Sequence, residues 1–232
     1  MTNALDLTLI SIRRSDTATA DIPAILHVDQ PGLRSGRGRR NERLIVYLTL
    51  TGEATFPVQQ QGQMVARLAR IYYKTDGAST AALRAASEEI NQYLLDRNRR
   101  SQSSGLQTVG LAALMVLRGD SMYAAMSGPI SIFHVSQGSL RHFADPAPST
   151  RGLGLTRSAP YYFVSIQLSP GDLLIATPQL PAGWDGVTLG NLRKLSAGRM
   201  AALLLERALD PAQAALIQAS KGSGKIQLLR PL

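Results

Sequence analysis

The residues of this 232-residue chain that could do chemistry are few. The sequence contains no cysteine, which excludes disulfide scaffolds, thiolate zinc sites and cysteine nucleophiles. Its three histidines, His27, His134 and His142, leave little material for a histidine metal centre or a Ser-His triad. The segment 222–225, Gly-Ser-Gly-Lys, has the letters that end a phosphate-binding P-loop. That motif also needs a glycine at Ala219 and a hydroxyl residue at Ile226, so we reject it.

The chain is strongly basic, with 25 Lys and Arg residues against 16 Asp and Glu residues and a net charge of +9. Such density could bind a phosphate backbone, so a basic nucleic-acid-binding domain is one alternative. The chain has no helix-turn-helix, zinc-finger or RNA-recognition signature, and only 5% of its residues are aromatic. These features favour solvated surface charge over nucleic-acid binding. Five arginines fall close together, at Arg34, Arg37, Arg39, Arg40 and Arg43.

The elements that must position these residues follow from hydrophobic periodicity. Short alternating or β-branched runs predict strands at 5–9, 24–28 and 44–50, and helical spacing predicts two helices between 59 and 98. A polar linker is expected over 97–104. The chain then continues with hairpin-linked strands, two helices at 197–209 and 212–219, and a closing strand at 225–229. The hairpin-linked strands are expected at 105–117, 121–126, 130–135, 140–143, 161–168 and 172–176.

Hairpin-linked strands with segregated helices predict an α+β fold with antiparallel sheets, in a single domain over 1–232. No apolar run approaches the roughly 20 residues that span a bilayer. The N-terminus lacks the basic start and apolar stretch of a signal peptide. We therefore expect a cytoplasmic domain without membrane insertion. The sequence indicates no oligomeric state.

Several local sequences, in this order of elements, resemble the PPM-type metal-dependent serine/threonine protein phosphatases, from about Gly36 to Leu229. The clearest stretch is 111–128, which resembles the two central strands of that family. Segment 168–176 is similar to the strand that delivers the family's Ser-Asp-Gly motif, and Gly152-Leu153-Gly154 to its later leucine–glycine turn. The resemblance implies a sandwich of two antiparallel β-sheets flanked by helical pairs.

The resemblance also implies chemistry in which carboxylates hold two Mn²⁺ or Mg²⁺ ions and a bridging water attacks a phosphoester. Most of the matching positions in this chain lack a carboxylate. Only a glutamate is kept, and a guanidinium at one position would repel a metal ion. The resemblance therefore implies a degenerate member with no catalytic residue, no metal and no cofactor. The degenerate positions are Glu42, Arg43, Thr51, Gly52, Pro129, Pro178 and Gly224.

We interpret the chain as a catalytically inactive pseudophosphatase that binds a protein or a phosphorylated or acidic peptide. The alternative is an active Mn²⁺- or Mg²⁺-dependent phosphatase with displaced ligands, for which Glu53 and Asp185 are the available acids. Asp172 matches a turn aspartate outside the metal site, so we expect it to hold a turn.

A third hypothesis concerns an anion site at Arg37, Arg39 and Arg43. The resemblance places the family's phosphate-binding arginine at Gly38, between Arg37 and Arg39, and a metal ligand at Arg43. A fixed fork of donors suits phosphate or carboxylate groups, so a cationic cleft could remain where the active site was. The competing interpretation is a solvated loop, because Gly32, Gly36 and Gly38 fall in the same segment.

Overall fold

Eleven strands form two stacked sheets in the computed structural model, which describes residues 4–14, 24–33, 35–52, 56–101, 105–147 and 151–230. Sheet A has the order β11 (Ile226–Leu228), β1 (Leu5–Arg14), β10 (Ala212–Lys221), β9 (Leu173–Thr177), β6 (Ser131–Ser136) and β7 (Ser139–Ala144). Sheet B has the order β2 (Ile25–Asp29), β3 (Glu42–Gly52), β4 (Thr108–Arg118), β5 (Ser121–Ser127) and β8 (Tyr162–Gln167). Neighbouring strands are antiparallel except β1 and β11, which are parallel.

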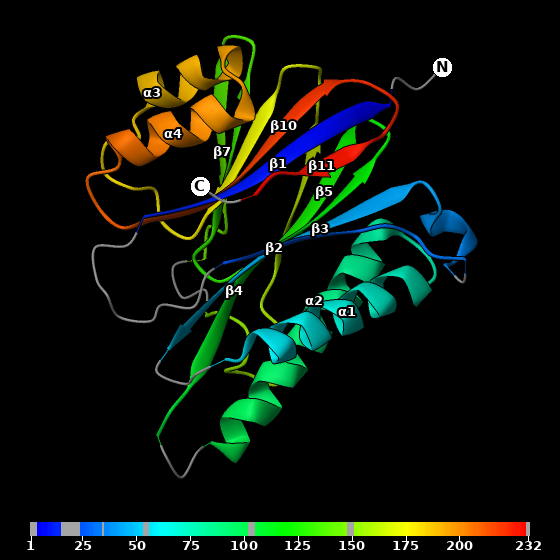
Figure 1. The fold of residues 1–232 in the computed structure, drawn as a ribbon. Helices are drawn as coiled ribbons and strands as arrows, with labels where there is room; N and C mark the ends of the chain where they lie inside the picture. The colour runs from blue at the N-terminus through cyan, green and yellow to red at the C-terminus, as the bar shows by residue number, and fades with distance from the viewer. Residues whose placement is uncertain are drawn as a thin grey trace.

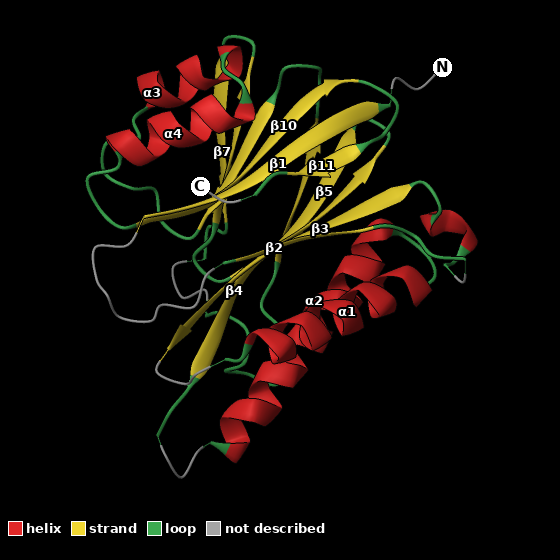
Figure 2. Cartoon of the chain, viewed as in Figure 1, coloured by secondary structure: helices red, strands yellow, loops and turns green. Residues whose placement is uncertain are grey.

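A pair of helices covers the outer face of each sheet (Figure 1). Helices α1 (Val58–Lys74) and α2 (Ser79–Arg100) lie on sheet B. Helices α3 (Gly186–Asn191) and α4 (Ala197–Arg207) lie on sheet A. Figure 2 shows the resulting layers, with the two sheets between the two helical pairs. This arrangement confirms the predicted α+β sandwich. Two short 3₁₀ turns, η1 (Arg37–Arg39) and η3 (Leu192–Lys194), complete the helical structure.

The apolar run that begins at Leu44 is continuous because both faces of β3 are covered. Leu44, Val46 and Leu48 pack against α1 and α2. Ile45 and Tyr47 face the core between the sheets. Alternation along β3 therefore serves two apolar cores at once, and these two residue sets fix the register of the central strand.

The helix predicted at 212–219 is wrong, because this segment is strand β10. It pairs with β1 on one side and β9 on the other. Leu216 faces the α3–α4 layer, whereas Ala215 and Ile217 face the other sheet. A strand buried on both faces has the same apolar content as a buried helix, so periodicity could not separate the two. The second helix of the C-terminal pair is α3, which was not predicted.

The polar linker predicted over 97–104 begins too early, because α2 continues to Arg100. Buried Asn98 explains the extension. Its Nδ2 donates to the carbonyl oxygens of Thr108 and Gly154 at 2.8 and 2.9 Å, and its Oδ1 accepts from the amide of Thr108 at 2.8 Å. The last turn of α2 is thereby attached to the start of β4. Among the described helices, none is both long and apolar enough to cross a membrane.

Candidate functional site

The positions predicted to be remnants of one metal site lie at opposite ends of the sandwich. Glu42 is the first residue of the 11-residue strand β3 and Gly52 is its last. At about 3.3 Å per residue, these two ends are roughly 30 Å apart. Glu42 and Arg43 therefore cannot have shared a dinuclear site with Thr51 and Gly52, and the structure corrects that grouping.

Thr51, Gly52, Pro129, Thr177 and Pro178 do share one end, which we call the motif end. Pro129 lies in the short link that carries the chain from β5 in sheet B to β6 in sheet A. The first residue of β6, Ser131, pairs with Thr177. Three of the positions that the resemblance assigned to aspartate motifs thus lie at the same end of the two sheets.

The strand that completes the motif end is β10 rather than the segment at Gly224. The Thr177 hydroxyl donates to the carbonyl oxygen of Gln213 in β10, 3.0 Å away. Gly224 follows the far end of β10, in the turn that leads into β11. The predicted match of Gly224 to the family's closing aspartate is therefore corrected, since Gln213 is the residue beside Thr177.

The side chains of the motif end do not fit two hard divalent cations. Prolines offer no side-chain ligand, and the Thr177 hydroxyl already donates within the fold. Arg13 pairs with Gln213 and shares the inner face of β1 with Leu7 and Leu9 by alternation. Its charge would oppose a metal ion. Within the described ranges, no three or more His, Asp or Glu side chains gather into a group that could hold a metal.

The acids proposed as displaced ligands do not supply such a group. Glu53 lies outside the described residues. Asp185 begins α3, where its Oδ1 accepts the Thr188 amide at 2.7 Å. This backbone hydrogen bond lowers the pKa of Asp185. Asp172 holds a turn, as expected, because its Oδ2 accepts the amide of Ser169 at 2.9 Å and lies 2.9 Å from Nε2 of His134.

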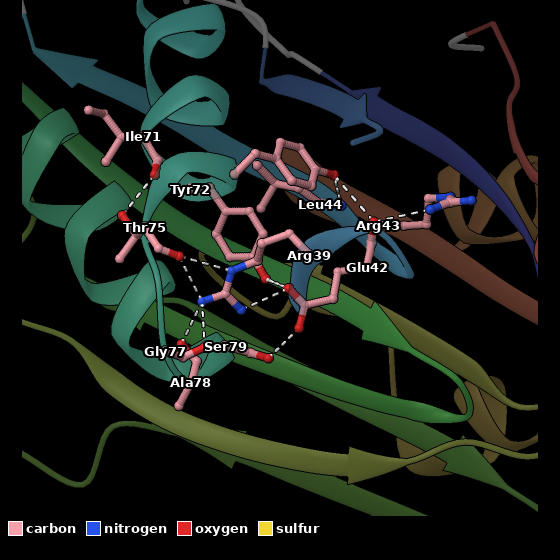
Figure 3. Close-up of polar contacts among 11 residues, drawn as sticks. Arg39, Glu42, Arg43, Leu44, Ile71, Tyr72, Thr75, Gly77, Ala78 and Ser79 are labelled. Carbon is pink, nitrogen blue, oxygen red and sulfur yellow. Dashed lines mark hydrogen bonds and ion pairs between the residues drawn. The ribbon is translucent and has the colours of Figure 1, made fainter. Parts of the chain in front are cut away.

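Arg39 and Glu42, at the opposite end, form a buried network with the turn between α1 and α2 (Figure 3). Arg39 is 2% exposed and Glu42 is fully buried. Arg39 Nη1 donates to Glu42 Oε2 at 2.9 Å. Its Nη2 donates to three carbonyl oxygens of the turn, and its Nε donates to one of them. The carbonyl groups belong to Thr75, Gly77 and Ala78.

The carboxylate of Glu42 is also saturated within the fold. It accepts the hydroxyl groups of Tyr72 and Ser79, each at 2.6 Å. Burial, together with the bond to Glu42, raises the pKa of Tyr72, which keeps it a neutral donor. Arg39 is therefore a structural residue, and the hypothesis that it binds an external anion is corrected. Ser79 was not predicted as a site residue, and nothing in its spacing signalled a bond to Glu42.

Arg43 points away from this network (Figure 3). It lines a hollow of about 760 Å³ together with Asp6, Gly224 and Lys225. The structure thus brings together Arg43 and Gly224, two of the degenerate positions, but at the end opposite to the motif end. The side chain of Arg37 lies outside the description.

The sequence matches no protein-family model and no curated protein. Solved structures, in contrast, match almost the whole chain. A serine/threonine phosphatase of S. agalactiae is 13% identical, with a TM-score of 0.71 over 92% of this chain and 99% of its own. One from Staphylococcus aureus is 10% identical, with a TM-score of 0.62 over 93% and 95%. The catalytic domain of PstP, solved with two manganese ions, is 15% identical, with a TM-score of 0.57 over 91% and 99%. These neighbours are PPM-type serine/threonine phosphatases, and the chain has their fold.

Proposed function

We propose that this chain is a pseudophosphatase, a PPM-phosphatase fold that acts by binding a partner and carries no dinuclear metal chemistry. The motif end carries the proposal. Three of the positions assigned to aspartate motifs lie at that end of their strands, and they are occupied by Thr51, Pro129 and Pro178. The strand beside them contributes Gln213. This is the pattern expected when a scaffold is retained and its ligands are replaced.

Two divalent cations need ligands whose negative charge balances their own. Mn²⁺ and Mg²⁺ are held in proteins by several oxygen ligands, with carboxylates to balance their charge. The five residues that define the motif end have uncharged side chains, and Arg13 adds a positive charge on the inner face of β1. None of the five residues that define the motif end supplies a carboxylate to balance the charge of a cation.

A protein partner, or a phosphorylated or acidic peptide, is the binding role that the charge of the chain favours. The net charge of +9 steers acidic surfaces toward it and speeds their association. Nucleic acid shares that attraction. A measured affinity for a random duplex that falls steeply with salt would replace the protein-binding proposal with a nucleic-acid one.

Hydrolysis of p-nitrophenyl phosphate with millimolar Mn²⁺ tests the catalytic half of the proposal. A manganese-dependent phosphatase of the same fold serves as the positive control. We expect hydrolysis at the rate of the buffer alone. Manganese-dependent turnover would support the alternative enzyme, and its loss in Glu53→Ala or Asp185→Ala would identify the displaced ligand.

A further inference from the structure

We propose that the hollow beside Arg43 binds the phosphate group of a phosphorylated peptide segment. The hollow, which we call the Arg43 hollow, is lined by Asp6, Arg43, Ser223, Gly224 and Lys225. It lies at the end of the sandwich opposite to the motif end. The proposal names a ligand for the binding role above and in that sense rests on it. It uses different residues, so either proposal can fail alone.

Arg43 presents its guanidinium to the Arg43 hollow from the inner face of β3. It alternates with Leu44, whose side chain packs under α1 and α2. Arg43 Nη1 donates to the carbonyl oxygens of Glu42 and Arg40 at 3.2 and 3.4 Å. These contacts orient the guanidinium and leave Nε and Nη2 with no hydrogen bond to any described residue. A planar fork held in this way suits two oxygens of a phosphate group.

The opposite wall is the turn between β10 and β11, which is fixed by Asp6. The Oδ1 atom of Asp6 accepts the amides of Ser223 and Lys225, both at 2.7 Å. These bonds lower the pKa of Asp6, so it stays a carboxylate. The Gly-Ser-Gly-Lys segment at 222–225 thus forms a turn whose backbone amides bind the carboxylate of Asp6. Lys225 itself also lines the hollow.

A second hollow adjoins the first, which indicates a ligand longer than a free ion. It measures about 430 Å³ and shares Arg43, Ser223 and Gly224 with the first. Arg118 and Asn41 line its far part. Arg43 is therefore the common wall of one elongated depression, with Lys225 on one side and Arg118 on the other. A phosphorylated side chain could reach Arg43 while its own backbone extends along the depression.

The acids of the depression favour a phosphate over a carboxylate. Asp6 and Asp120 oppose the three cations, so the net charge of the lining is small. A phosphomonoester carries about −1.5 to −2 at neutral pH and three acceptor oxygens, whereas Asp or Glu carries a single charge. The guanidinium and ammonium groups therefore gain more from a phosphoserine than from an acidic residue at the same distance.

Binding of a short phosphoserine peptide to the full chain tests the proposal, with its unphosphorylated and glutamate forms and inorganic phosphate as comparison ligands. We expect saturable binding of the phosphoserine form only. Because a hydrogen bond to a charged group contributes about 1.5 kcal/mol or more, Arg43→Gln should weaken it about tenfold. Lys225→Gln gives a second, independent variant. Arg99→Gln removes the same charge at the far end of α2, where Arg99 is half exposed, and should leave binding within about twofold.

Equal losses in Arg43→Gln and Arg99→Gln, or no saturable binding in the parent, would overturn the site. Inorganic phosphate that binds as tightly as the peptide would overturn the assignment to a peptide segment. Melting temperatures of each variant show whether it is folded. The metal assays on the motif end do not depend on these results. If the phosphopeptide does not bind, the pseudophosphatase proposal still stands. If the chain binds Mn²⁺, the phosphopeptide site can still be present.

Discussion

The hydroxyl of Thr177 donates a hydrogen bond to the carbonyl oxygen of Gln213, 3.0 Å away, and so joins the ends of β9 and β10. The resemblance to PPM phosphatases assigns the adjoining segment of β9 to a metal-binding aspartate motif. In this chain the same corner is closed by an internal hydrogen bond between a hydroxyl and a backbone carbonyl. The scaffold therefore holds this end together through its own polar groups.

Loss of the Glu42 carboxylate should strongly destabilise the fold. Glu42→Gln removes the charge that faces Arg39 and weakens the acceptors of Tyr72 and Ser79. Breaking one side of a buried ion pair costs about 3 kcal/mol or more, measured as the free energy of unfolding in urea. Arg99→Gln is the control, because its exposed pair with Asp96 contributes at most about 1 kcal/mol. Comparable losses in the two variants would contradict the structural role of Arg39 and Glu42.

Truncation of Asn98 should release the last turn of α2 from β4 and from the loop at Gly154. Asn98→Ala leaves the Thr108 amide and two carbonyl oxygens without their partner. An unsatisfied buried polar group costs about 1–3 kcal/mol. Chemical denaturation should show a loss of that size, whereas Gln92→Ala, on the exposed face of α2, should stay within about 0.5 kcal/mol. If Asn98→Ala were as stable as Gln92→Ala, the hydrogen bonds that attach the end of α2 to β4 would contribute nothing to the free energy of unfolding.

Part of the folding stability should depend on pH through the ionisation of Asp6. Its pKa is lowered in the folded state, chiefly by the backbone bonds to Lys225 and Ser223. A depressed acid stabilises the fold at pH values above its unfolded pKa of about 3.9, and this contribution is lost as the pH falls through the folded pKa. Asp6→Asn should therefore be less stable than the parent at neutral pH, and the difference should shrink in acid. A difference that is independent of pH in urea titrations would contradict this.

The sequence predicted the layers of this fold better than it predicted its site. Strands such as β3 and β4 were located from their short, continuous apolar runs between turn residues. β10 was not, because alanines buried on both faces of a strand look like a buried helix. Glu42 and Thr51 were assigned to one site because local motif letters carry no information on strand length. Once β3 is a single continuous strand, the same letters lie at opposite ends of the molecule.

Restored acids should recover metal affinity at the motif end if this end is the remnant of the site. Thr51→Asp and Pro178→Asp together place two carboxylates where the described side chains are neutral, and both positions are accessible. We expect Mn²⁺ affinity to rise at least about tenfold over the parent, since carboxylates are the preferred ligands. The same pair of aspartates placed at Thr80 and Gln137, two exposed and uncharged positions, is the matched control. Equal gains in both variants would show that added charge alone explains the effect.

Titration of Mn²⁺ into the full chain by calorimetry at neutral pH is the most direct test of the central claim. The motif end, with Thr51, Pro129, Pro178 and Gln213, predicts no saturable binding at micromolar metal. Stoichiometric binding of Mn²⁺ with micromolar affinity would contradict the pseudophosphatase account.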